Sequence, residues 1–337
     1  MEKKKNGAKP TPGKAKGYPY HKKTVTDSAT GQKLDAAKRP KKSKIPEHRA
    51  ATGSELAKAI QWFPGHMTKA IREINESLAN VDLAIEVCDA RIPVSSRNPN
   101  LTKILNGKPC LTLMNKASLA DPNRMAAWKK HFAERGETVI FTDCRTGTGI
   151  NEIIPAVRTL LADKLEAYER KGMRRLPRAM ILGVTNAGKS TLINTLCGMR
   201  KAKTEDRAGV TRSQQWVTVE GTVELLDTPG ILWPKFDDEN VGLHLAYTGA
   251  IKDDILDKEE ISVLLLGELM EKYPKLLLQR YRLTQDDLDG HAPFEVFERI
   301  ARARGLLIGG GDIDSLRCAG MLLDEFRDGR IGRVTLE

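Results

Sequence analysis

Short apolar runs alternate with amphipathic stretches over much of the chain. The apolar runs, which have the length of buried strands, lie at 81–87, 110–114, 138–141, 179–184, 216–219 and 223–226. Apolar residues recur at helical spacing in the stretches 67–78, 122–135, 150–170 and 191–197. This alternation of strands and helices is typical of an α/β fold with a mostly parallel sheet.

The two ends of the chain have different patterns. From about residue 255 the pattern is helical, with helices predicted at 261–273, 293–304 and 312–326. Residues 1–58 alternate Lys with small and polar residues, so they cannot bury enough apolar surface to fold. We therefore expect a disordered basic extension at 1–58, an α/β domain at 59–250 and a small all-helical domain at 251–337.

The excess positive charge is concentrated in the first 60 residues. They hold 16 Lys and Arg against 5 Asp and Glu, whereas the remaining residues hold 39 of each. Such a polycation favours contact with RNA phosphates, although a solubilising tail has the same composition. No apolar run is long enough for a membrane span, no secretory signal is visible, and the scattered cysteines favour reduced thiols. We expect a cytoplasmic protein that makes no membrane contact.

One segment has the pattern of a phosphate-binding loop. Gly183 to Ser190 reads Gly, four residues, Gly-Lys-Ser, between a predicted strand and a predicted helix. Its backbone N–H groups would surround a polyphosphate at the positive end of the helix dipole. Lys189 would contact the β- and γ-phosphates, and Ser190 would bind Mg²⁺. The expected nucleotide contacts come from Asn186, Ala187, Gly188, Lys189, Ser190 and Thr191.

Two later segments have the positions of nucleotide switches. Thr211 lies in a polar stretch and is the candidate to close on Mg²⁺ and the γ-phosphate. Asp227-Thr228-Pro229-Gly230 ends a predicted strand after the phosphate loop. Asp227 would hold Mg²⁺ through water, and the Gly230 N–H would contact the γ-phosphate. Such a turn is common by chance, but its spacing from the phosphate loop favours a nucleotide site.

Two earlier loops have features of guanine recognition. Asn115-Lys116 ends a predicted strand, as in the motif Asn-Lys-x-Asp, whose Asp accepts two hydrogen bonds from guanine. The Asp position is Ser118 here, and a neutral hydroxyl is not a bidentate charged acceptor, so we expect weaker discrimination against ATP or xanthine nucleotides. In the second loop, Cys144 stands near a Gly-x-Gly turn where Ser-Ala is usual.

The order of these loops is unusual, because the base-recognition loops precede the phosphate loop. In ordinary GTPases the phosphate loop comes first. The order therefore predicts a circularly permuted P-loop GTPase domain, whose loops still meet at the carboxyl ends of one parallel sheet. The permutation places the second switch directly before the C-terminal helical region.

Five segments of the chain carry a family resemblance, at 61–67, 89–93, 95–99, 213–216 and 227–235. Through them the chain resembles the RbgA/YlqF-type circularly permuted GTPases over about residues 60–337. The resemblance implies hydrolysis of GTP to GDP and phosphate, coupled to late assembly of the bacterial 50S ribosomal subunit. It also implies that the C-terminal helical domain binds RNA and is similar to ANTAR domains.

The resemblance also implies residue roles. His66 of Pro-Gly-His-Met is the implied catalytic histidine, and Ile231 occupies the position of the usual water-orienting Gln. Asn186 matches the asparagine that helps to hold K⁺ in potassium-activated GTPases, where the ion replaces the charge of an arginine finger. The expected catalytic residues are thus His66, Lys189 and Thr211. The expected metal ligands are Ser190, Thr211 and Asp227 for Mg²⁺ and Asn186 for K⁺.

We expect a monomeric GTPase that binds GTP and GDP, is slow alone and is stimulated by the large ribosomal subunit with its rRNA and proteins. Two alternatives stay open. One is a nucleotide-gated RNA-binding module with negligible turnover away from ribosomes. The other is an organellar homologue, which the Lys-rich extension disfavours.

Overall fold

The computed structural model describes residues 25–26, 33–34, 65–173, 175–198, 215–233, 236 and 238–337, with side chains except at 25–26, 33–34, 65–70, 215 and 239. The chain divides into two units, residues 1–42 and 43–337. In the first unit, β1 (Val25–Thr26) and β2 (Lys33–Leu34) pair antiparallel. The rest of the extension that we expect to be disordered, 1–58, lies outside the described residues.

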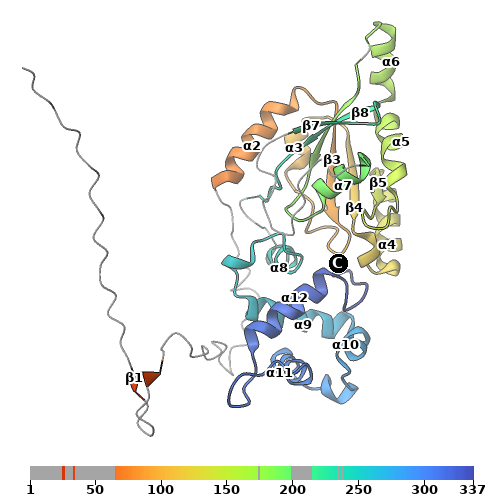
Figure 1. The fold of residues 1–337 in the computed structure, drawn as a ribbon. Coiled ribbons are helices and arrows are strands. Elements are labelled where there is room, and N and C mark those ends of the chain that lie inside the picture. The colour runs from red at the N-terminus through yellow and green to blue at the C-terminus, as the bar shows by residue number, and fades with distance from the viewer. Residues whose placement is uncertain are drawn as a thin grey trace, which may run out of the picture. The chain divides into compact units, whose positions relative to one another are not determined.

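The second unit contains a six-stranded sheet in the order β5-β4-β3-β6-β8-β7 (Figure 1). Its strands are β3 (Leu83–Asp89), β4 (Cys110–Asn115), β5 (Val139–Phe141), β6 (Arg178–Leu182), β7 (Gln215–Val219) and β8 (Val223–Asp227). All neighbours pair in parallel except β7, which runs antiparallel to β8 at one edge. The predicted mostly parallel sheet is confirmed.

The centre of the sheet is the pair β3 and β6. From this pair the chain builds outward in opposite directions, with β4 and β5 beyond β3 and with β8 and β7 beyond β6. In open α/β sheets, ligands bind in the crevice outside the carboxyl ends of the strands at such a reversal. The loops that come first in the sequence therefore lie next to the phosphate loop, as the predicted permutation requires.

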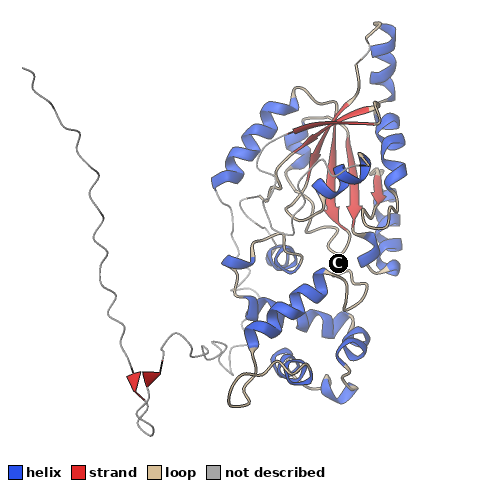
Figure 2. Cartoon of the chain, in the orientation of Figure 1, coloured by secondary structure: helices blue, strands red, loops and turns tan. Residues whose placement is uncertain are grey.

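Helices cover both faces of the sheet, and α2 and α5 lie on opposite sides of it (Figures 1 and 2). The helices of this part are α2 (Gly65–Leu78), α3 (Leu101–Leu105), α4 (Pro122–Glu134), α5 (Ile150–Leu160), α6 (Ala162–Arg170) and α7 (Lys189–Leu196). Ala84 of β3 packs in a cluster with α2 and α3, whereas Leu83 and Ile85 belong to the cluster that contains α5 and α7. Burial on both faces explains the continuous apolar runs of these strands.

The helix predicted at 150–170 is two helices. The backbone leaves helical geometry at Leu161, with φ −109° and ψ 11°, and this buried side chain separates α5 from α6. α5 buries three residues, but α6 buries none. Figure 1 shows α6 extending beyond the sheet, so the packing that supports one straight helix ends at Leu161.

The C-terminal helices gather beyond the carboxyl ends of the strands (Figure 2). They are α8 (Glu239–Tyr247), α9 (Lys258–Lys272), α10 (Pro274–Tyr281), α11 (Pro293–Ala303) and α12 (Ser315–Arg327). The predicted helical C-terminal region is confirmed, whereas α3, α8 and α10 were not predicted, because short helices carry little periodic signal. None of the described helices has both the length and the apolar character that crossing a membrane requires.

Candidate nucleotide-binding site

The phosphate loop between β6 and α7 needs glycine at two positions. Gly183 has φ +142°, and a Cβ there would lie 2.2 Å from the carbonyl oxygen of Val87 in β3. Gly188 has φ +99°, and a Cβ there would lie 2.3 Å from Nδ2 of Asn115. The two glycines thus allow the loop to pack against β3 and against the first base-recognition loop.

Lys189, the first residue of α7, is buried in this loop. Its Nζ donates hydrogen bonds to the carbonyl oxygens of Gly183 (3.0 Å) and Val184 (2.8 Å). Burial lowers the pKa of Lys189 to about 8, although the Asp227 carboxylate acts in the opposite direction. The structure therefore places the ammonium group where the loop would enclose a phosphate.

Asp227 and Ser190 form the part of the site suited to Mg²⁺. Ser190 Oγ lies 3.5 Å from Oδ2 of Asp227, at the end of β8. Oδ1 of Asp227 is buried and has no hydrogen-bond partner among the described residues. Burial raises the pKa of this carboxyl, with Lys189 opposing the shift. A buried carboxylate oxygen without a partner, next to a hydroxyl, fits the oxygen ligands that Mg²⁺ prefers.

The segment after β8 packs directly on the phosphate loop. A Cβ at Gly230 would lie 2.7 Å from Cα of Thr185, and the Ile231 N–H donates to the carbonyl oxygen of Gly183 at 3.3 Å. The Ile231 side chain is buried in a cluster with Ile74 of α2. Ile231 is therefore a core residue at the position where many GTPases have a polar glutamine.

Two of the predicted catalytic side chains cannot be placed. His66 lies in the first turn of α2, but its side chain is outside the described residues. Thr211 is also outside them. The roles predicted for both residues stay predictions.

Asn115 joins three loops of the site. Its Nδ2 donates to the carbonyl oxygen of Ala187 in the phosphate loop at 2.8 Å. Its Oδ1 accepts a hydrogen bond from Sγ of Cys144, at 3.3 Å, in the second base-recognition loop. The structure thus brings the predicted residues Asn115, Ala187 and Cys144 together, although they are far apart in the sequence.

The neighbouring Lys116 is held by a buried carboxylate, Asp89, at the end of β3. Lys116 Nζ lies 2.9 Å from Oδ2 of Asp89, and Arg91 pairs with the same carboxylate at 2.8 Å. Burial raises the pKa of Asp89, but the two cations outweigh burial and hold it well below its usual value. Arg91 also donates to the carbonyl oxygen of Phe326 in α12 at 3.0 Å, so this cluster links the base loop to the C-terminal helices.

Asp143 is a site residue that was not predicted from the sequence. Oδ2 of Asp143 accepts hydrogen bonds from the Ser118 backbone N–H at 3.1 Å and from the Ser118 hydroxyl. Oδ1 accepts from the backbone N–H groups of Arg145 (2.8 Å) and Thr146 (3.0 Å). The signal in the sequence that could have identified Asp143 is its position directly before Cys144 in the second base loop.

The phosphate loop also contacts the segment that follows α8. Asn186, with φ +57°, donates from Nδ2 to the carbonyl oxygen of Gly249 at 2.7 Å. The Thr185 hydroxyl donates to the carbonyl oxygen of Ala250. These bonds connect the predicted K⁺ ligand to the chain that leads into the C-terminal helices.

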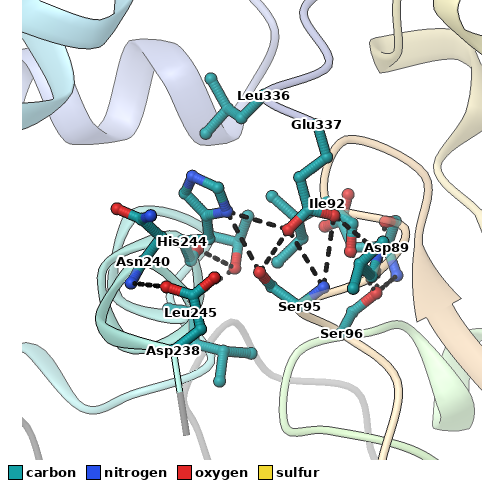
Figure 3. A network of polar contacts seen from close by, with 12 residues as sticks. Asp89, Ile92, Ser95, Ser96, Asp238, Asn240, His244, Leu245, Leu336 and Glu337 are labelled. Carbon is teal, nitrogen blue, oxygen red and sulfur yellow. Dashed lines mark hydrogen bonds and ion pairs between the residues drawn. The ribbon is translucent and has the colours of Figure 1, made fainter. Parts of the chain in front are cut away.

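A second polar network joins His244 of α8 to Ser95 and to Glu337 at the end of the chain (Figure 3), and it also includes Glu268 of α9. Nδ1 of His244 lies 3.0 Å from Oε1 of Glu337, and Nε2 lies 3.2 Å from Oε1 of Glu268. Burial lowers the pKa of His244, but the two glutamates outweigh burial and raise it to about 9. The Glu337 carboxylate also accepts from the Ser95 N–H at 3.1 Å and from the Ser95 hydroxyl, so the network reaches the loop after β3.

Comparisons with known proteins also indicate a GTPase. Residues 178–267 match a family model described as 50S ribosome-binding GTPase. The chain is 46% identical over 279 residues to ribosome biogenesis GTPase A of Bacillus cereus, which covers 82% of this chain and 93% of the relative. It is 33% identical over 294 residues to mitochondrial ribosome-associated GTPase 1 of Mus musculus, which covers 82% and 90%.

A solved structure has the same fold. GNP-bound YlqF from T. maritima is 28% identical, has a TM-score of 0.55 and is matched over 80% of this chain and 97% of that chain. The base loops precede the phosphate loop in sequence but lie beside it in the sheet, as a permuted GTPase requires. Together with the identity to the Bacillus cereus protein over most of both chains, these findings show that the chain belongs to the ribosome biogenesis GTPase A family.

Proposed function

We propose that this GTPase binds a precursor of the large ribosomal subunit and couples GTP hydrolysis to a late step of its assembly. The observation that carries the proposal is the meeting of the phosphate loop, Asp227 and both base loops at the carboxyl ends of adjacent strands. Relatives of similar length are named for ribosome biogenesis, which supports the choice of partner. The protein would act as a cytoplasmic monomer.

The phosphate end of the site would be divided among a few residues. The loop N–H groups and Lys189 would bind the β- and γ-phosphates, while Ser190, Thr211 and Asp227 would hold Mg²⁺. The ion neutralises the charge that develops on the phosphate oxygens. A contact between the Gly230 N–H and the γ-phosphate would make the 227–231 segment sensitive to GTP, and Thr191 would contact the nucleotide from α7.

His66 is our candidate for the catalytic residue that Ile231 cannot be. Ile231 is buried in a cluster with Ile74 of α2. His66 lies in the first turn of that helix. A movement of the 227–231 segment on binding GTP would therefore be transmitted to the helix that carries His66. For Asn186 we propose K⁺ binding through the side-chain oxygen, because no arginine finger is evident in the sequence.

The same geometry suggests how hydrolysis would affect the C-terminal region. Asn186 and Thr185 hold the backbone of Gly249 and Ala250. If Asn186 turns to a K⁺ ion when GTP binds, its bond to Gly249 is lost, and the C-terminal helices (251–337 in the proposed division, after a GTPase domain at 59–250) receive the change. Those helices and the basic extension 1–58 would contact rRNA.

The test is turnover of GTP and ATP by the full chain, in KCl and in NaCl, with and without purified 50S subunits. We expect slow GTP hydrolysis alone and stimulation by 50S particles that requires K⁺. His66→Ala should remove the stimulated rate and leave GDP affinity unchanged. Glu76→Ala, at an exposed position of the same helix, is the matched control and should keep the stimulated rate.

The possible results separate the proposal from its alternatives. Stimulation by 50S that is equal in KCl and NaCl would contradict only the role of K⁺ and would leave the rest of the proposal standing. An absence of turnover under all conditions, with GTP-dependent binding to 50S retained, would mean a nucleotide-gated binding protein and would refute the coupled hydrolysis.

A further inference from the structure

The guanine-recognition loop of this chain has a serine where the motif has its carboxylate, yet a carboxylate lies next to that serine. Asp143 comes from the second base loop, which follows β5, and Ser118 comes from the first, which follows β4. In the usual arrangement the first loop supplies the acid and the second supplies a serine. Here the first loop supplies a serine, and the second supplies a carboxylate one residue before Cys144, which stands at the usual serine position.

Asp143 is not itself placed to accept from a base. Its side chain is 1% exposed, and its two oxygens already accept four hydrogen bonds, from Ser118 N–H, the Ser118 hydroxyl, Arg145 N–H and Thr146 N–H. A carboxylate has about four lone-pair sites, so this one is fully used. These bonds outweigh burial, which alone would raise the pKa, and hold the pKa of Asp143 below its usual value.

Ser118 is the more accessible residue of the pair. Its side chain is only partly buried, at the position that faces the base in the motif. Its single hydroxyl proton is donated to Asp143, so the oxygen has only lone pairs left for a ligand. A hydroxyl can usually either donate or accept, but this one can only accept.

We propose that the Ser118–Asp143 pair recognises guanine, with Ser118 Oγ as an obligatory acceptor of the guanine N1–H and 2-amino hydrogens and Asp143 as the positioning residue that fixes the hydroxyl proton. The negative charge behind the hydroxyl strengthens its acceptance. Adenine presents an acceptor at N1 and xanthine presents an oxygen at position 2, so each would leave Ser118 facing a lone pair. The pair therefore selects guanine, and it replaces the weak discrimination expected from Ser118 alone. This inference rests on the proposed nucleotide site.

The test is equilibrium binding of GDP, ADP and xanthosine diphosphate to the full chain and to Asp143→Asn. The amide of this variant keeps an oxygen that accepts from Arg145 and Thr146, but it puts an NH₂ group against Ser118, so the serine hydroxyl must turn its proton toward the base. We expect the preference for GDP over xanthosine diphosphate to fall by about tenfold or more, because Ser118 would then offer guanine a donor instead of an acceptor. An unchanged preference in folded Asp143→Asn would overturn the proposal.

Returning the carboxylate to the first loop gives a second, independent readout. Ser118→Asp alone places two carboxylates together and should weaken GDP binding, whereas Ser118→Asp with Asp143→Ser should return GDP affinity to within about threefold of wild type. GDP affinity that is as low in the double variant as in Ser118→Asp would contradict the pairing of residues 118 and 143.

Two controls separate this inference from the function on which it rests. Asp121→Asn makes the same charge change near the first loop, where Asp121 caps α4, and should leave the base preference unchanged. Lys189→Ala should abolish binding of all three nucleotides. If Lys189→Ala still binds GDP like wild type, the proposed phosphate site is wrong; if only the Asp143→Asn preference is unchanged, the site stands and the recognition pair is wrong.

Discussion

At the scale of single residues, the phosphate loop depends on Gly188, because a side chain there would meet the amide of Asn115. The φ of +99° and the 2.3 Å approach to Nδ2 make alanine unfavourable both in conformation and in space. We predict that Gly188→Ala displaces Asn115, weakens GDP binding by about tenfold or more and lowers the free energy of unfolding by about 1–3 kcal/mol. Isothermal titration and urea denaturation measure the two effects.

Gly198, just after α7, provides the matched control. Its φ is +60°, but a Cβ there would have no atom of the described residues within 4 Å. Gly198→Ala should therefore cost about 1 kcal/mol of backbone strain and leave GDP affinity unchanged. Equal losses of GDP affinity in the two variants would show that the contact with Asn115 does not matter.

The same scale shows what the sequence can and cannot reveal about the site. Lys189 and Asp227 were predicted because a phosphate loop and its metal need those residue types at that spacing. Asp143 and Asp89 were not, because their partners, Ser118 and Lys116, lie on other loops that only the sheet brings close. Burial of a carboxylate is not visible in a sequence.

At the scale of elements, the strands were predictable and some helix boundaries were not. A parallel strand buried on both faces has an apolar run that identifies it without knowledge of its neighbours. The division of 150–170 at Leu161 depends instead on where the sheet ends under the helix, which is a tertiary contact. α8 is short and is buried from residue 242 to residue 247, so it lacks the long amphipathic pattern that would identify it as a helix.

The connection between α12 and α8 depends on Arg327. Its guanidinium donates to the carbonyl oxygens of Tyr247 and Ala246 at 3.0 Å each and pairs with Asp253 at 2.8 Å. The two carbonyl groups lie at the end of α8, just before Gly249, which the phosphate loop holds. Arg327→Ala should lower the free energy of unfolding by about 2 kcal/mol and reduce stimulation of hydrolysis by 50S, with GDP affinity retained.

Arg330→Ala is the control for this prediction, because the side chain of Arg330 is exposed and pairs with the exposed Asp328. Its effect on unfolding should stay within about 0.5 kcal/mol. A stimulated rate in Arg327→Ala equal to that of wild type would show that the link between α12 and α8 does not carry the nucleotide state.

At the scale of the unit 43–337, the last residues fasten the C-terminal helices to the sheet. Val334 and Leu336 are 1% exposed, and their N–H groups donate to the carbonyl oxygens of Leu119 and Arg91. The sequence did not predict these contacts, because the partners are loops more than two hundred residues earlier in the chain. Its packing behind the base loop gives the C-terminal region a direct contact with the nucleotide site.

The network around His244 makes this attachment dependent on pH. The groups that face the imidazole are Glu268 of α9, Glu337 and Ser95, and Lys272 pairs with Glu268 from the same helix. Because the pKa of His244 is raised from 6.5 to about 9, the stabilisation is complete below pH 6.5 and is lost as the pH rises through 9. We predict that the free energy of unfolding falls over this range by about 3 kcal/mol at most.

Denaturation of wild type and His244→Gln at pH 6.5, 7.5 and 9 measures this contribution as a difference. Lys189, whose pKa is lowered to about 8, adds stability as the pH rises above 8, so only the difference between the two proteins isolates His244. The advantage of wild type should be largest at pH 6.5 and should have mostly disappeared above pH 9. His291→Gln, at the more exposed His291, is the control and should follow wild type. A difference between wild type and His244→Gln that is constant with pH would show that the histidine packs there without carrying the charge that the two glutamates stabilise.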